Sequence, residues 1–203
     1  MFQFRKISCH LIKHKLSYIL LLILIIIGFI SGCFYTNFLS DGEFLDAGIQ
    51  AEEFIKRAKE HELNLNLMLS EELSTYLLIA LCSLFLPGFI PTVFLVFKWG
   101  FSSGFFLTFL IKYFAMKGFF LGGLFLLTNL LFFLFSLLLI ANKSLSLNRY
   151  LLCAALHRAP SKQNLSEELI TMTIITLIAV GMVTLGVFLK FLLLSPLSNY
   201  LFL

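Results

Sequence analysis

Long apolar runs separated by short polar segments make up most of this 203-residue chain, in which 60% of residues are hydrophobic and 13% are charged. A helix of about 20 apolar residues crosses the roughly 30 Å hydrocarbon core of a bilayer. The pattern predicts an all-α, polytopic integral membrane protein with about five transmembrane helices and almost no soluble domain. The spans are expected at residues 18–39, 73–88, 91–112, 118–141 and 169–190.

The apolar block that begins at Leu73 can be divided in two ways. Residues 87–91 have a proline at each end and a glycine between them, which is a strong turn signal. A turn there gives the spans 73–88 and 91–112. The alternative keeps 73–97 whole and leaves a short span after Lys98. The first division accounts for both prolines and places Lys98 within the bilayer.

The distribution of charge predicts the sides of the membrane. The first 17 residues carry four basic side chains and no acidic one, and segment 142–166 is also basic. Both are therefore expected in the cytoplasm by the positive-inside rule. Segment 40–72 holds nine of the eleven acidic residues and is expected outside. The N-terminus then lies inside, and 142–166 forms a cytoplasmic loop.

An amphipathic helix is predicted within segment 40–72. Ser40 and Glu43 have the spacing of a capping box, which marks a helix start. A narrow apolar stripe follows at three- and four-residue steps. Its members are Ala47, Ala51, Phe54, Ile55 and Ala58. Such a helix could lie on the membrane surface, meet a partner, or pack in part against the rest of the chain.

The pentapeptide Leu-Ser-Glu-Glu-Leu occurs twice, at residues 69–73 and 165–169. Each copy precedes a predicted span. We expect each serine to cap its helix and each glutamate pair to lie at the positive end of the helix dipole.

Glycines four residues apart occur in three places, and small residues at this spacing let helices approach closely in lipid. The pairs are Gly28 and Gly32, Gly100 and Gly104, and Gly118 and Gly122. They predict close helix packing, either within one chain or between chains.

Two polar residues are predicted at membrane depth, Lys98 and Asn129. An ammonium group there costs at least about 2.5 kcal/mol and needs a partner, a wet cavity or a route to the interface. Lys98 is therefore expected either to have a functional role or to extend its side chain to the headgroups.

Residues 100–104 match the G-x-S-x-G pattern of serine hydrolases, with Ser102 in the place of the nucleophile. A serine nucleophile needs a base, and all four histidines lie outside the predicted spans. Small residues for helix packing account for the segment, and no catalytic residue is assigned.

Other chemistries receive little support from the sequence. The four cysteines have no C-x-x-C spacing, and neither a metal site nor a cofactor is expected. Residues 30–33 resemble a lipobox, in which Cys33 would be lipidated, but an intact first span is expected instead. The net charge of +4 is scattered along the chain, so no nucleic-acid partner is expected.

Residues 97–105 and 123–129 together resemble the core of the stage II sporulation protein M family. The first stretch has a lysine and then glycines alternating with aromatic residues. The second has a glycine, then leucines and an asparagine, with Thr128 where proline is usual. The resemblance implies a five-span, non-enzymatic scaffold in the membrane of a sporulating bacterium. It also implies a role in engulfment, with stage II sporulation proteins D and P, two peptidoglycan-degrading enzymes, as partners.

Three functions are compared on this basis. The first is a scaffold in the bacterial cell membrane that contacts lipids and partner proteins, with a homo-oligomer as one alternative for its assembly. The second is a permease or permease subunit that uses Lys98 near a broken helix. The third is an intramembrane hydrolase centred on Ser102.

Overall fold

The computed structural model describes residues 15–59, 64–155 and 162–201 and is helical nearly throughout. Its elements are α2 (Lys15–Tyr35), α3 (Asp41–Lys59), α4 (Leu65–Cys82), α5 (Phe89–Thr128), the π-helix η1 (Asn129–Leu134), α6 (Phe135–Ala155) and α7 (Lys162–Leu201). No strand occurs in these ranges. The expected all-α fold is confirmed.

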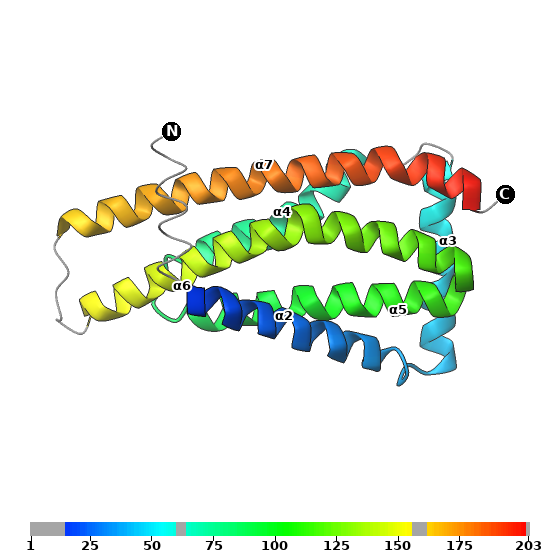
Figure 1. The fold of residues 1–203 in the computed structure, drawn as a ribbon, viewed down its shortest axis with the longest axis horizontal. Coiled ribbons are helices and arrows are strands. Elements are labelled where there is room, and N and C mark those ends of the chain that lie inside the picture. The colour runs from blue at the N-terminus through cyan, green and yellow to red at the C-terminus, as the bar shows by residue number, and fades with distance from the viewer. Residues whose placement is uncertain (1–14, 60–63, 156–161, 202–203) are drawn as a thin grey trace.

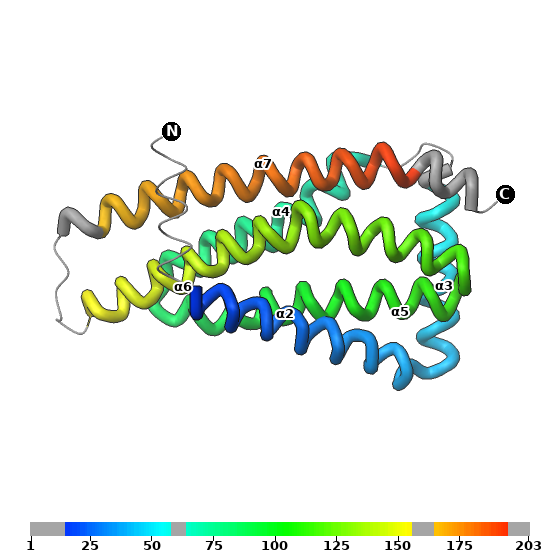
Figure 2. The backbone as a smooth tube through the Cα atoms, in the orientation of Figure 1, coloured from blue at the N-terminus to red at the C-terminus, as the bar shows by residue number. Residues whose placement is uncertain are grey.

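The long helices lie side by side along one direction, and α3 runs across one end of the bundle (Figure 1). Within the described residues, four helical stretches are long and apolar enough to cross a membrane: Lys15–Tyr35, Leu65–Cys82, Phe89–Ala155 and Leu165–Leu194. The third stretch turns back on itself within α5, as the backbone trace in Figure 2 shows. It therefore provides two passes, and the described ranges together make five.

The reversal within α5 occurs at Ala115, whose φ of 51° and ψ of −125° are not helical. An L-residue rarely adopts a positive φ, because its Cβ then crowds the backbone. The two arms of α5 approach closely just beyond this point. A Cβ added at Gly118 would lie 1.8 Å from the carbonyl oxygen of Leu110. Glycine at 118 thus permits the tight hairpin between the third and fourth passes.

The predicted limits of the second span are wrong. The span was expected at 73–88, but α4 begins at Leu65 and ends at Cys82. Asn64 caps it, with the N–H of Asn66 donating to Asn64 Oδ1 at 3.0 Å. The apolar residues before the glutamate pair add two turns at the start, so the predicted segment 40–72 includes the beginning of α4.

The predicted loop conformation of 142–166 is also wrong, because most of this segment is helix. Its cytoplasmic side stays a prediction. α6 continues to Ala155 and α7 begins at Lys162. The polar residues that indicated a loop are instead buried against neighbouring helices, namely Asn142, Lys143, Ser144 and Asn148. The fourth pass thus extends beyond the expected 118–141, and α7 extends past the expected end at 190.

α3 packs on the end of the bundle through its apolar stripe. Of the three roles expected for this helix, packing against the rest of the chain is therefore observed. Ile55 is 5% exposed and clusters with Phe109, Leu110, Leu121 and Leu194. The phenol of Tyr113 donates to Glu52 Oε1 at 3.0 Å. The capping box is confirmed, since the hydroxyl and N–H of Ser40 donate to Glu43 Oε2 at 2.8 and 3.1 Å.

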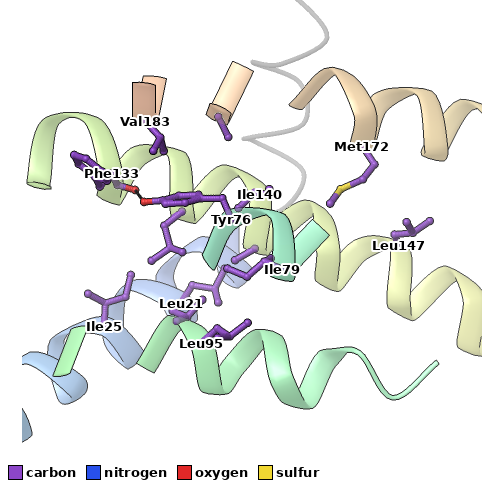
Figure 3. Packing of buried hydrophobic residues seen from close by; sticks show 14 of the residues in the cluster. Leu21, Ile25, Tyr76, Ile79, Leu95, Phe133, Ile140, Leu147, Met172 and Val183 are labelled. Carbon is purple, nitrogen blue, oxygen red and sulfur yellow. Dashed lines mark hydrogen bonds between the residues drawn. The ribbon is translucent and has the colours of Figure 1, made fainter. Parts of the chain in front are cut away.

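The main core lies where α2, α4, α5, α6 and α7 meet, as Figure 3 shows. Tyr76 of α4 is fully buried there, and its hydroxyl donates to the carbonyl oxygen of Phe133 at 3.0 Å. Phe133 belongs to η1, whose wider turns shift backbone groups away from the α-helical pattern. The π-helix is thus tied to α4 next to the cleft described below.

Candidate functional site

A polar cleft of about 590 Å³ lies between α4, α5, η1 and α7, and we call it the intramembrane cleft. Its lining combines charged, hydroxyl and amide side chains with three aromatic ones. The polar members are Glu71, Glu72, Thr75, Lys98, Ser102, Ser103, Asn129 and Lys190, and the aromatic members are Trp99, Phe106 and Phe125. Both polar residues that the sequence placed at membrane depth, Lys98 and Asn129, belong to it.

The cleft lies about halfway through the membrane. α4 ends at Cys82 and α5 begins at Phe89, on either side of one short connection. Glu72 lies about 15 Å of helix rise before Cys82, and Lys98 lies about 14 Å beyond Phe89. The hydrocarbon core is roughly 30 Å thick, so both groups are near its middle.

One pair of charges in the cleft is neutralised within the chain. Lys190 Nζ donates to Glu72 Oε1 at 2.9 Å, and the Lys190 side chain is 6% exposed. The same ammonium lies 4.0 Å from the ring centroid of Phe133, within the range of a cation–π contact. The sequence placed Lys190 at the outer end of the last span. That interpretation is wrong, because the lysine is held inside the bundle.

The repeated pentapeptide supplies this pair and a second one like it. Lys143 of α6, whose side chain is 3% exposed, pairs with Glu168 of α7. Glu72 and Glu168 are the same position of the two copies. The predicted capping role is wrong for both, because α4 starts at Leu65 and α7 at Lys162, ahead of each copy. The repeat instead places a carboxylate opposite a buried lysine.

Other polar groups of the cleft are free. Among the described residues, Lys98 and Glu71 have no ion-pair partner, and the side chains of Thr75, Ser102 and Asn129 have no hydrogen-bond partner. Two nearby hydroxyls, by contrast, are hydrogen-bonded within α5. Ser103 donates to the carbonyl oxygen of Trp99 at 3.0 Å, and Thr128 donates to that of Leu124. The free groups are therefore available to a ligand or a partner.

The arrangement around Ser102 differs from that of a serine hydrolase. The G-x-S-x-G segment lies within an uninterrupted part of helix α5, whereas a nucleophile elbow is a sharp turn from strand to helix. Ser102 and Lys98 line the same cleft one turn apart, but no hydrogen bond joins them. The four histidines lie outside the described residues.

Two of the three glycine pairs meet at one crossing between α2 and α5. A Cβ at Gly28 or Gly32 would lie 2.5 or 2.1 Å from the carbonyl oxygen of Phe97 or Phe101. A Cβ at Gly100 or Gly104 would lie 2.4 or 2.1 Å from the carbonyl oxygen of Ile25 or Phe29. All four positions thus require glycine for this approach of the two backbones.

The remaining glycine pair packs the two arms of α5 together. Gly118 faces the backbone at Leu110, and a Cβ at Gly122 would lie 2.8 Å from the Leu107 side chain. All six predicted glycines therefore make contacts within one chain. Cys33 lies in the α2–α5 interface, with its thiol 3.5 Å from the carbonyl oxygen of Gly104.

The sequence did not identify Glu71, Glu72, Thr75 or Lys190 as members of this site. The two glutamates preceded an expected span and were placed outside the lipid, and the lysine was placed at the outer end of the last span. The sequence did hold a signal for this, because four of the five residues at 65–69, just before the glutamates, are apolar. In the part of the chain that the structure describes, no group of three His, Cys, Asp or Glu residues is placed to hold a metal ion.

Comparison with known proteins gives no assignment: no family model, no curated protein and no solved structure matches this chain.

Proposed function

We propose that this protein is a non-enzymatic scaffold of a bacterial cell membrane that holds partner membrane proteins. The observation that carries the proposal is the free Lys98 at mid-membrane depth, on the exposed wall of the intramembrane cleft. A charge left there in lipid costs at least about 2.5 kcal/mol. A protein bound against the bundle would remove that cost. The resemblance to the stage II sporulation protein M family supplies the expected partners, peptidoglycan-degrading enzymes that act during engulfment.

The test is purification of the tagged full chain from its own membranes in mild detergent, followed by mass spectrometry of what is retained. The scaffold is supported if the tagged chain retains more peptidoglycan hydrolase than a tagged control membrane protein of similar size does. A chain recovered alone over a range of mild detergents contradicts it.

A permease or permease subunit is the second candidate, and the size of the cleft favours it. A volume of about 590 Å³ is within the usual range of small-molecule sites. The π-helix at 129–134 interrupts the α-helix of the fourth pass, and interrupted helices commonly build transport sites. Recovery of an ATPase with the tagged chain would support this function over the scaffold.

A further inference from the structure

We infer that a transmembrane helix of a partner protein packs over the opening of the intramembrane cleft, and that Lys98 pairs with a carboxylate near the midpoint of that helix. The inference rests on the proposed scaffold function and names the chemistry of the partner. Its basis is the unpaired ammonium of Lys98 and the two free hydrogen-bonding side chains that line the cleft with it, and Glu71 is left there as an unpaired carboxylate.

Glu72 and Lys190 neutralise each other at 2.9 Å, so they do not select a charged partner. Lys98 is left with an unpaired positive charge. Ser102, one turn further along α5, and Asn129 of η1 line the same cleft with a free hydroxyl and a free amide. An ionised carboxylate has two oxygens and can accept several hydrogen bonds. One ammonium with two neutral donors therefore matches a carboxylate.

The depth of Lys98 favours a helix over a lipid headgroup as the source of the anion. Lys98 lies about 14 Å of helix rise from the start of α5, near the centre of a core roughly 30 Å thick. Phospholipid phosphates lie at the edges of that core, beyond the length of a lysine side chain. A residue in the middle of a partner's span reaches this depth without deforming the bilayer.

Glu71 allows a further test, because its charge should affect binding in the direction opposite to that of Lys98. Its carboxylate also lines the cleft without an ion-pair partner, and its negative charge repels the carboxylate of an incoming helix. Removal of the Glu71 charge should therefore strengthen binding of the acidic helix, whereas removal of the Lys98 charge should abolish the preference for it. A natural partner is expected to carry a hydrogen-bond donor for Glu71 on the same face.

The experiment uses the full chain reconstituted in phosphatidylcholine vesicles. The probe is a synthetic leucine–alanine helix of about 20 residues with one glutamate at its midpoint. Control peptides carry glutamine at the midpoint or glutamate near one end. Association is measured by energy transfer between dyes on the peptide and the protein. We expect the midpoint-glutamate peptide to bind about tenfold more tightly than the glutamine peptide.

Four variants sharpen the test. Lys98→Leu should remove the preference, Lys98→Arg should keep it, and Glu71→Gln should increase it. Lys56→Leu removes an exposed lysine of α3 and should change nothing. Equal binding of all peptides to the wild type overturns the inference. The inference is also overturned if anionic phosphatidylglycerol in the vesicles abolishes the preference, because a lipid then occupies the cleft. It is overturned as well if two copies of the chain pair through Lys98 and this pairing abolishes the preference.

Failure of this inference can be distinguished from failure of the proposed scaffold function. If Lys98→Leu retains the same natural partners as the wild type, the scaffold stands and the inference fails. If the wild type retains no partner at all, the scaffold fails whatever the peptides do.

Discussion

Glu72 and Lys190 are 118 positions apart in the chain, yet Lys190 Nζ lies 2.9 Å from Glu72 Oε1 and joins α4 to α7. Breaking a buried pair on one side leaves an uncompensated charge and typically costs about 3–5 kcal/mol. Glu72 is one-third exposed, so we expect about 2–3 kcal/mol for Glu72→Gln, which leaves Lys190 unpaired at 6% exposure. Unfolding in mixed detergent micelles measures this change.

The matched control for that prediction is the Glu53–Arg57 pair of α3, whose side chains are 63% and 64% exposed. Its loss in Glu53→Gln should change stability by less than about 1 kcal/mol. The double variant Glu72→Gln with Lys190→Met should recover part of the loss, because position 190 then no longer carries an unpaired charge. Equal effects of Glu72→Gln and Glu53→Gln would show that the internal pair is not important for stability.

The crossing of α2 and α5 gives a second prediction. Gly104→Ala places a methyl group 2.1 Å from the carbonyl oxygen of Phe29, so the two helices must separate. Overpacking of this kind costs about 1–3 kcal/mol. Gly181→Ala in α7 adds the same group where nothing lies within 4 Å, and alanine favours the helix. Thermal unfolding in detergent should show a loss for the first variant and none for the second.

Much of this fold was predictable from residue patterns, because hydrophobic length and small-residue spacing are local properties. The reversal between 112 and 118, the capping box at Ser40 and the stripe of α3 all follow from such patterns. The burial of Lys143 and Lys190 was not predictable in this way. A lysine beside an apolar run indicates a membrane edge unless its partner is known, and each partner here comes from a different helix.

The candidate site was predictable only where the depth of a residue can be inferred from its local sequence. Lys98 and Asn129 stand alone within long apolar runs, so each could be placed at depth without knowledge of its neighbours. Glu71 and Glu72 could not, because their depth depends on where α4 begins. The cleft that unites them forms only when four separate helical segments pack together.

The helix break at Ala115 gives a third prediction. Its φ of 51° costs an L-residue about 1–3 kcal/mol, whereas glycine adopts it freely. Ala115→Gly should therefore stabilise the protein by about 1 kcal/mol after the extra entropy of the unfolded chain is subtracted. Gln50→Gly, at an exposed position in the middle of α3, should destabilise by roughly half a kcal/mol. The same sign for both variants in detergent unfolding would contradict a strained turn.

The capping box of α3 makes the start of this helix sensitive to pH. The hydroxyl of Ser40, and then its backbone N–H, hydrogen-bond to the Glu43 carboxylate and lower the pKa of Glu43 below its ordinary value of 4.5. The folded state therefore binds this proton less readily than the unfolded state. The contribution of the cap is complete above the unfolded pKa and is lost as pH falls through the lowered pKa of the folded form.

We expect the carboxyl carbon of Glu43, followed by NMR in micelles, to titrate below the range of an unstructured glutamate. Amide protection at Glu43 and Phe44, corrected for intrinsic exchange, should fall over the same pH interval. Glu43→Gln keeps an acceptor in the capping box and should make this protection independent of pH. Ser40→Ala should raise the pKa of Glu43 towards its ordinary value, since the hydroxyl donor is lost while the backbone N–H of residue 40 remains. A Glu43 pKa at or above 4.5 in the wild type would mean that the box is open in the membrane-bound protein.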